Sequence, residues 1–225
     1  MELKTEGIVL KRHRSGEKDD ITFIFTRAIG KVMVSSKGTQ KMMSKLKPAL
    51  ELFSVNNYQL LKSKKDSKYF TLINAQPVKM FQNMRNSLRK IGFCYLVVEL
   101  LNKFTEIEDP HEELYDAAKQ IMEIVEANNY SNIENIESYF KLMILKYAGY
   151  DLATDALYLK DHHISREVKE LFVKIQSSPD VSKLDVEYDV IREINMAIDA
   201  YVVHTLGEDV FSTKFIDGLR DGQKK

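Results

Sequence analysis

The sequence predicts an α+β protein of two domains, a small β-barrel over residues 1–80 and an all-α helical domain over residues 81–225. Three observations support this prediction. Short runs of alternating or β-branched residues fill the first third of the chain, apolar residues recur every three or four positions afterwards, and the sign of the net charge changes between the two parts. A chain of 225 residues with 44% hydrophobic residues can give both domains a core.

Five runs in the first third are typical of strands. They are an alternating segment around Ile8 and Leu10, and then Ile21–Thr26, Lys31–Ser36, Leu50–Leu61 and Tyr69–Val78. Gly30 suits a tight turn between the second and third runs. Five strands with a loop near residues 37–49 indicate a small closed barrel such as an OB-fold, and periodicity leaves an SH3-like barrel open.

The spacing of apolar residues changes after Met80, where we place the domain boundary. The residues Phe81, Met84, Leu88, Ile91, Tyr95 and Val98 mark one face of a long helix, and apolar residues on its other sides predict that it is central. Capping signals predict further helices that begin at Asp109-Pro110, at Ser131 and at Ser165. Gly149 and Gly207 are predicted helix ends.

The net charge of zero conceals an uneven distribution. Residues 1–80 hold 16 Lys and Arg against 7 Asp and Glu, whereas residues 91–225 hold 14 against 26. We therefore expect the barrel to attract polyanions and the helical domain to repel them.

The cations of the first third are the candidate binding residues. They are Lys11, Arg12, Arg14, Lys31, Lys37, Lys41, Lys45 and Lys47. Lysine and arginine contact phosphates, and a glycine such as Gly38 lets backbone N–H groups approach them. The alternative is that these side chains form only a solvated surface. The strand aromatics Phe23, Phe25, Phe53, Tyr58 and Tyr69 are candidates both for base stacking and for the core.

No residue pattern indicates an enzyme. Glu17, Asp19 and Asp20 form a carboxylate cluster that would suit a metal-dependent nuclease, but without a matching partner carboxylate we assign it a structural role. The pair His162-His163 lacks the further ligands of a zinc site, and Cys94, the single cysteine, lies in an apolar run typical of a core. We expect no catalytic residue, no bound metal and no cofactor.

The sequence favours a cytoplasmic protein. The N-terminus lacks the apolar stretch of a signal peptide, and the apolar run Cys94–Val98 is far shorter than a membrane span. A single cysteine also fits a reducing compartment.

The chain resembles the RecO family of bacterial recombination mediators. The resemblance rests on Glu6–Leu10, Gly16-Glu17, Asp19-Asp20, the run ITFIFT, Gly30-Lys31 and Lys37-Gly38 with Ser44, and later on Tyr139–Leu142 through Gly149-Tyr150. The segment from Tyr201 to Ile216 is similar to the final helix and short tail of that family. The similarity spans nearly the whole chain, and the order of the motifs carries more weight than any one of them.

This resemblance implies an N-terminal OB-fold and a role in DNA repair without enzymatic activity. Proteins like this bind single- and double-stranded DNA, anneal complementary strands, and with RecR help RecA displace single-stranded-DNA-binding protein. The basic surface of the family falls here on Lys11, Arg12, Arg14, Lys37, Lys41 and Lys45. A protein-interaction adaptor or an RNA-binding OB-fold protein is the alternative function.

The chain departs from that family in two respects. Many members carry a four-cysteine zinc module after the Gly-Tyr pair, whereas Asp151–His163 here is short and without cysteine, so we expect no zinc. Some relatives hold the acidic tail of single-stranded-DNA-binding protein on the helical domain. An acidic helical domain needs a local basic pocket for that contact, for which Arg85, Arg89 and Lys90 are the candidates.

Overall fold

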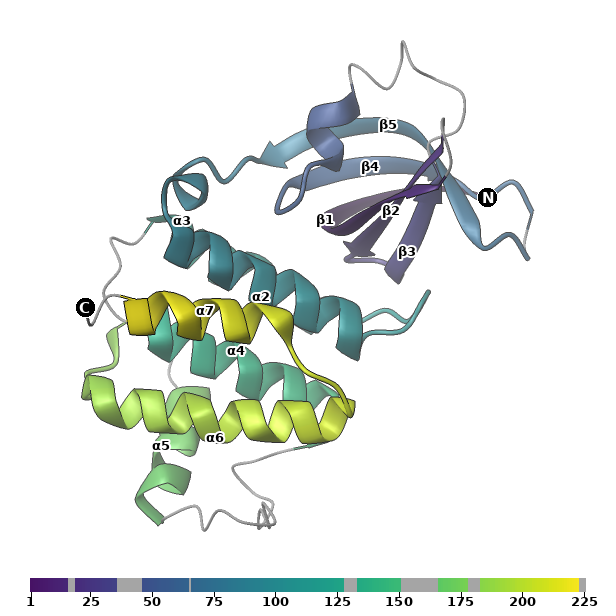
Figure 1. Cartoon of the computed structure of the whole chain (residues 1–225). Coiled ribbons are helices and arrows are strands. Elements are labelled where there is room, and N and C mark those ends of the chain that lie inside the picture. Colours follow the sequence, from purple (N-terminus) through teal and green to yellow (C-terminus); the bar gives the residue numbers. More distant parts are fainter. Residues whose placement is uncertain are drawn as a thin grey trace. The chain divides into compact units, whose positions relative to one another are not determined.

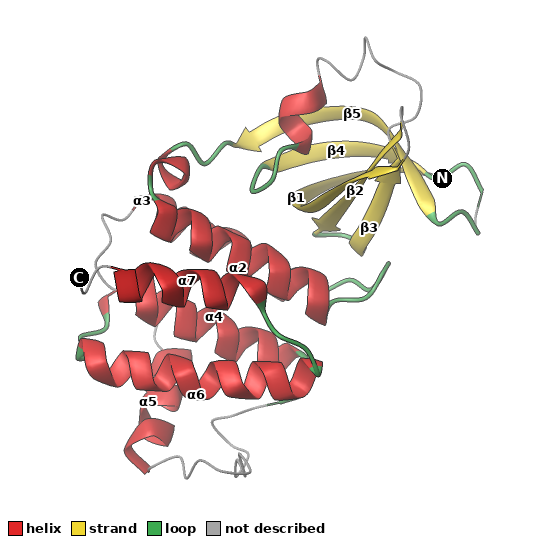
Figure 2. Cartoon of the chain, viewed as in Figure 1, coloured by secondary structure: helices red, strands yellow, loops and turns green. Residues whose placement is uncertain are grey.

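The computed structural model describes residues 1–15, 19–35, 46–64, 66–127, 133–150, 166–177 and 183–222 (Figure 1). Within these residues the strands come first and the α-helices follow. Figure 2 distinguishes the strands from the helices by colour. The predicted α+β class is therefore confirmed.

The strands form a closed barrel in the order β1–β2–β3–β5–β4. Their bounds are β1 Glu2–Ser15, β2 Asp19–Thr26, β3 Gly30–Ser35, β4 Val55–Leu61 and β5 Tyr69–Lys79. Strands β3 and β5 pair in parallel, and the other neighbours pair antiparallel. This closed five-strand barrel confirms the predicted OB-fold.

The barrel interior is filled by inward-facing residues of all five strands. The cluster holds Val9, Ile24, Val32, Val34, Tyr58, Leu60, Phe70 and Leu72, together with Leu46 and Leu50. Tyr58 is buried, and its hydroxyl donates to the backbone carbonyl of Ala49 at 2.6 Å, so its polar tip is satisfied. Burial raises the pKa of this phenol well above its ordinary value.

Strand β4 begins later than the predicted segment Leu50–Leu61. Residues Lys47–Leu50 form the 3₁₀ helix η1, with Pro48 in its first turn. Phe53 then takes a φ of 67°, outside the extended region. Proline fixes φ near helical values, so this segment turns before it can extend, and pairing starts at Val55.

Gly30 ends the turn between β2 and β3 and has a φ of +72°. A Cβ at this position would lie 1.8 Å from the backbone oxygen of Asp109. Glycine is required here because its φ is positive and because any side chain would collide with the Asp109 backbone. This confirms the predicted tight turn.

The helical part begins with the short 3₁₀ helix η2, Asn83–Asn86. The α-helices that follow are α2 Leu88–Phe104, α3 Glu112–Ala127, α4 Ile133–Tyr147, α5 Arg166–Ser177, α6 Tyr188–Leu206 and α7 Phe211–Gly222. Helix α2 has buried residues on most of its circumference, as predicted, including Cys94. Gly149 and Gly207 follow α4 and α6 with φ of +88° and +70°, which confirms both predicted helix ends.

Three boundary predictions are wrong. The long helix starts at Leu88 instead of Phe81, because η2 intervenes. Helix α3 starts at Glu112, so Pro110 precedes it. The expected short tail is helix α7, whose first amides, those of Phe211 and Ser212, donate to the Glu99 carboxylate at 3.0 and 2.8 Å. The predicted caps Ser131 and Ser165 lie outside the described residues.

The contacts divide the chain into two compact units. Residues 1–85 and 101–119 form the first, and residues 86–100 and 120–225 form the second. The connection around residues 101–119 thus packs with the barrel, where Tyr115 lies 6.0 Å from Phe25 between ring centroids. Among the described helices, none combines the length and apolar character needed to cross a membrane.

A buried ionic network lies inside the second unit. The ammonium of Lys141 contacts Glu137 at 2.5 Å and Asp199 at 2.6 Å. The guanidinium of Arg220 contacts the other oxygen of Glu137 at 2.6 Å. These contacts link α4, α6 and α7 through charged groups whose partners replace water.

Candidate nucleic-acid interface

The strand register places four residues side by side on the outer surface of the barrel. Lys11 of β1 lies opposite Phe23 of β2. Phe23 in turn lies opposite Met33 of β3, and Met33 lies beside Tyr69 of β5. Lys11 and Tyr69 are exposed, and the two residues between them are half-buried. We call this set the Lys11–Tyr69 row. With neighbouring strands about 4.8 Å apart, its four backbone positions span about 15 Å.

The first strand carries further cations. Arg12, the next residue, is also exposed, but it pairs with Thr22 of β2, so it leaves the strand on the face opposite to Lys11. Arg14 lies opposite Asp20 near the end of the β1–β2 hairpin, where the structure describes the backbone only. Both positions continue β1 beyond Lys11, and Arg12 is not a member of the Lys11–Tyr69 row.

Lys31 does not belong to this surface. It is 8% exposed, and its ammonium donates to the backbone carbonyl of Asn102 at 2.7 Å. Burial lowers its pKa, partly offset by Glu106. The prediction that Lys31 contacts a polyanion is corrected, because its charged end is bonded to the carboxyl-terminal turn of α2.

Several candidates lie outside what the structure describes. They are Lys37, Lys41 and Lys45, the side chain of Lys47, Glu17, the side chains of Asp19 and Asp20, and the pair His162-His163. Their roles stay predictions.

The turn between β4 and β5 adds cations that we did not single out from the sequence. Lys64 and Lys68 are exposed there. Lys62 instead pairs with Glu108 at 2.5 Å and lies 5.2 Å from the ring centre of Phe70. The lysine-rich composition of residues 62–68 is the sequence signal that could have identified these cations as candidates.

This turn shares one rim of the barrel with the β1–β2 hairpin. Ser35 at the end of β3 pairs with Ile21 of β2 and with Thr71 of β5. The start of β2 and the start of β5 are therefore separated only by β3. In OB-folds, oligonucleotides bind this outer face of strands 2 and 3, between the same two loops.

The structure separates stacking candidates from core aromatics. Phe25 and Tyr58 are buried, whereas Tyr69 is 41% exposed. Phe23 and Phe53 are half-buried. Tyr69 and Phe23, both members of the row, are therefore the aromatics available to a base.

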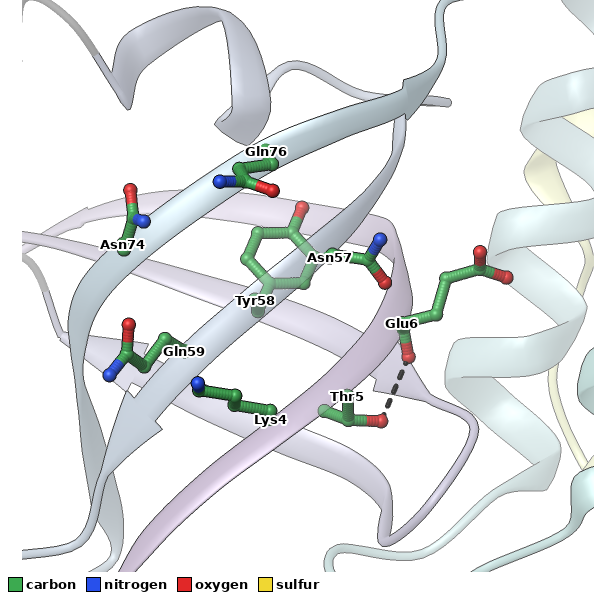
Figure 3. A pocket seen from close by; sticks show the side chains of 8 residues that line it. All are labelled: Lys4, Thr5, Glu6, Asn57, Tyr58, Gln59, Asn74 and Gln76. Atoms are coloured by element: carbon green, nitrogen blue, oxygen red, sulfur yellow. Dashed lines mark hydrogen bonds between the residues drawn. The ribbon is translucent and has the colours of Figure 1, made fainter.

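A second polar feature covers β1, β4 and β5. A surface pocket of about 400 Å³ is lined there by Lys4, Thr5, Glu6, Asn57, Tyr58, Gln59, Asn74 and Gln76 (Figure 3). The register aligns Lys4, Gln59 and Asn74 across the strands, and likewise Glu6, Asn57 and Gln76. We call these two sets the amide rows.

The one carboxylate of the amide rows is already bound. Glu6 accepts hydrogen bonds from the Tyr115 hydroxyl at 3.1 Å and from the Lys119 ammonium at 2.8 Å. The ion pair with Lys119 offsets the negative charge of Glu6 within the pocket.

The cations proposed for a pocket in the helical domain are largely occupied. Arg89 pairs with Glu134, and the ammonium of Lys90, 5% exposed, donates to the backbone carbonyl of Glu126 at 3.3 Å. Arg85 pairs with Glu51 at 2.8 Å in the barrel unit. These contacts argue against the basic pocket that the sequence suggested.

No metal or thiol chemistry is indicated within the described part of the chain. No group of three His, Cys, Asp or Glu residues there is placed to hold a metal ion. Cys94 is buried, and burial raises its thiol pKa, so the predicted core role is confirmed.

A closed OB-type barrel with cations and aromatics on this face, followed by a helical unit, defines a two-part OB-fold protein. Two family models match the chain. Residues 1–81 match the model for the recombination protein O N terminal, and residues 85–158 match that for the recombination protein O C terminal. The chain belongs to the RecO family.

Individual relatives carry the name DNA repair protein RecO. The chain is 26% identical to one from Alkaliphilus metalliredigens, over 66% of this chain and 59% of the relative. A relative from Caldanaerobacter subterraneus is 31% identical over 66% of this chain and 58% of its own length. These matches span about six tenths of the relatives, whereas one from Dehalococcoides mccartyi is 23% identical over 97% of this chain and 96% of its own length.

Proposed function

We propose that this protein is a non-enzymatic, cytoplasmic DNA-binding mediator of recombinational repair. The Lys11–Tyr69 row is the observation that carries the proposal, because it combines phosphate-binding and base-stacking groups on the oligonucleotide face of an OB-fold. The names of the relatives tie the family to DNA repair.

The mechanism that we propose is electrostatic. Lys11, Arg12, Lys64 and Lys68 neutralise phosphates of single- or double-stranded DNA, while Phe23 and Tyr69 stack on unpaired bases. Neutralised strands repel each other less, so complementary strands pair on the barrel without nucleotide hydrolysis. Lys37, Lys41 and Lys45, which the sequence predicts as contact residues, neutralise further phosphates in the same proposal.

The family also suggests partners. We propose that RecR binds the protein and that the pair helps RecA to displace single-stranded-DNA-binding protein. Contact with the acidic tail of the latter protein requires a basic surface other than the one formed by Arg89 and Lys90, because both cations are engaged within the helical unit.

The test is annealing of two complementary labelled oligonucleotides without ATP. The wild-type protein should accelerate pairing, and the variant Lys37→Glu with Lys41→Glu should bind and anneal weakly whatever the sequence. Lys146→Glu with Lys174→Glu is the control, since it makes the same charge change at exposed positions of the helical unit. Equal annealing by both double variants would remove the basic loop from the proposal.

Binding and cleavage assays separate the alternatives. Binding of labelled RNA in preference to single-stranded DNA and duplex would favour an RNA-binding protein. Cleavage of DNA in magnesium or manganese would instead favour a nuclease built on Glu17, Asp19 and Asp20. Lack of binding to every nucleic acid would favour a protein adaptor.

A further inference from the structure

The amide rows concentrate four carboxamides on one barrel surface. Gln59 and Asn57 of β4 lie directly opposite Asn74 and Gln76 of β5, respectively. Asn57, Asn74 and Gln76 are exposed, and Gln59 is half-buried. Figure 3 shows these side chains around a common surface.

This composition is unfavourable for strands. Asparagine is depleted in β-strands, and exposed paired positions are more often filled by β-branched or aromatic residues. Two of the carboxamides have internal contacts: Gln59 donates to Glu2, and Asn74 accepts from the amide of Ala75 at 2.9 Å. The remaining hydrogen-bonding capacity lines the pocket, where a ligand can use it.

The charges around the rows favour an anionic ligand. Glu6 is paired with Lys119, whereas Lys4 is exposed. Leu61, the last residue of β4, pairs with Thr71 of β5, which puts the lysine-rich turn at one end of the rows. Glu2 is a second carboxylate on this side, and it accepts a hydrogen bond from Gln59.

A peptide is a poorer fit than a nucleic acid. Extended peptides usually bind by adding a strand to an exposed sheet edge, and this barrel is closed. Carboxamides match base edges well, because each presents a donor and an acceptor side by side. A pocket of about 400 Å³ lies within the range of about 300–1,000 Å³ for small-molecule sites.

We propose that the amide rows are a second contact site for single-stranded DNA, one that hydrogen-bonds base edges while Lys4 contacts phosphate. Strand β5 belongs to both sites, with Tyr69 at its start and Asn74 and Gln76 further along. A single strand that stacks on Tyr69 therefore continues past the β4–β5 turn onto the amide rows. This inference rests on the proposed DNA-binding function.

The test uses the whole protein with the double substitution Asn57→Thr and Gln76→Thr. Threonine suits exposed strand positions, so the melting temperature of the variant should stay unchanged or rise. Affinity is measured for a mixed-sequence single strand and for an abasic oligomer of the same length and phosphate number. Gln82→Thr is the control, because it removes an exposed carboxamide beyond the end of β5.

We expect the double substitution to weaken binding to the base-bearing strand about tenfold and to leave the abasic oligomer unaffected. The control should change neither. An unchanged ratio between the two oligomers would overturn the amide-row proposal while leaving DNA binding in place. A wild-type protein that binds neither oligomer would overturn the proposed function itself, and equal losses on both oligomers would show that the rows do not read bases.

Discussion

Tyr69 is 41% exposed at the start of β5, beside Met33 and at the end of the row that begins with Lys11. Its ring covers little of the core, in contrast to Phe25 and Tyr58. An exposed ring on this face adds little to the folded state, yet it offers a stacking surface to an unpaired base.

Tyr69→Ala should therefore weaken binding to single-stranded DNA by about 1–3 kcal/mol, the usual contribution of one stacked base. Duplex binding should change little, since paired bases are already stacked. Fluorescence anisotropy with both forms of DNA measures the difference. Tyr188→Ala, which removes an equally exposed ring from α6, is the control, and a similar loss in both variants would refute the stacking role.

Lys11 and Lys31 show how burial decides the role of a lysine. Both belong to the basic first third of the sequence, but Lys11 is exposed and Lys31 donates to the Asn102 carbonyl. We expect Lys31→Met to lower the free energy of unfolding by about 1–3 kcal/mol, as for a lost charged hydrogen bond. The expected effect on DNA affinity is small.

Lys11→Met should do the opposite, weakening DNA binding while leaving stability nearly unchanged. Urea unfolding of the two variants measures their stability, and fluorescence anisotropy of labelled DNA measures their affinity. If Lys31→Met reduced affinity in the folded protein as strongly as Lys11→Met, Lys31 would have to be returned to the interface.

Helices α4, α6 and α7 are joined by the ionic network around Lys141. Burial raises the pKa of Asp199 to about 6, although Lys141 acts in the opposite direction. Desolvation would also raise the pKa of Glu137, but Lys141 and Arg220 lower it. Burial would lower the pKa of Lys141, and Asp199 and Glu137 together raise it, so the ammonium stays charged.

Asp199 predicts a specific pH dependence. An unfolded aspartate loses its proton near pH 3.9, and the folded Asp199 loses it near pH 6, so the folded state binds more protons between these values. Stability due to this group therefore falls as the pH rises through that window. Asp199→Asn removes the titration and leaves the opposing contribution of Glu137.

From about pH 4 to about pH 6.5, the wild type should lose about 2 kcal/mol of stability relative to Asp199→Asn. Urea unfolding of both proteins at a series of pH values measures this difference. If the free energy of unfolding changed with pH in the same way for both proteins, Asp199 would titrate alike in the folded and unfolded states.

At the scale of the whole chain, charge is divided between a basic first third and acidic residues 91–225. If Lys11, Arg12, Lys64 and Lys68 each contact one phosphate, the slope of log affinity against log salt should be about −3 for single-stranded DNA. Lys11→Gln with Lys64→Gln should reduce the slope by about 1.4. Titrations at several salt concentrations measure it, with Lys146→Gln as the control, and an unaltered slope in the double variant would place the phosphate contacts elsewhere.

Local patterns of residues determined much of this architecture. β-branched and aromatic runs such as Ile21–Thr26 became strands, and the glycines after α4 and α6 ended those helices, because these signals depend on backbone conformation at the residue itself. The segment 81–87 and helix α7 were misjudged. Their structure depends on η2 and on the Glu99 carboxylate, which bonds the first amides of α7 from a distant part of the sequence.

By itself, the sequence determined a basic β-barrel followed by an acidic helical part, since composition and periodicity are local properties. The tertiary structure alone decided that Lys31 is buried, that Tyr69 is the most exposed of the candidate stacking aromatics, and that carboxamides of β4 and β5 meet beside Lys4. The physical reason is strand register in a closed barrel. It makes neighbours of residues far apart in the chain, while packing of residues 101–119 with the barrel determines which side chains are covered.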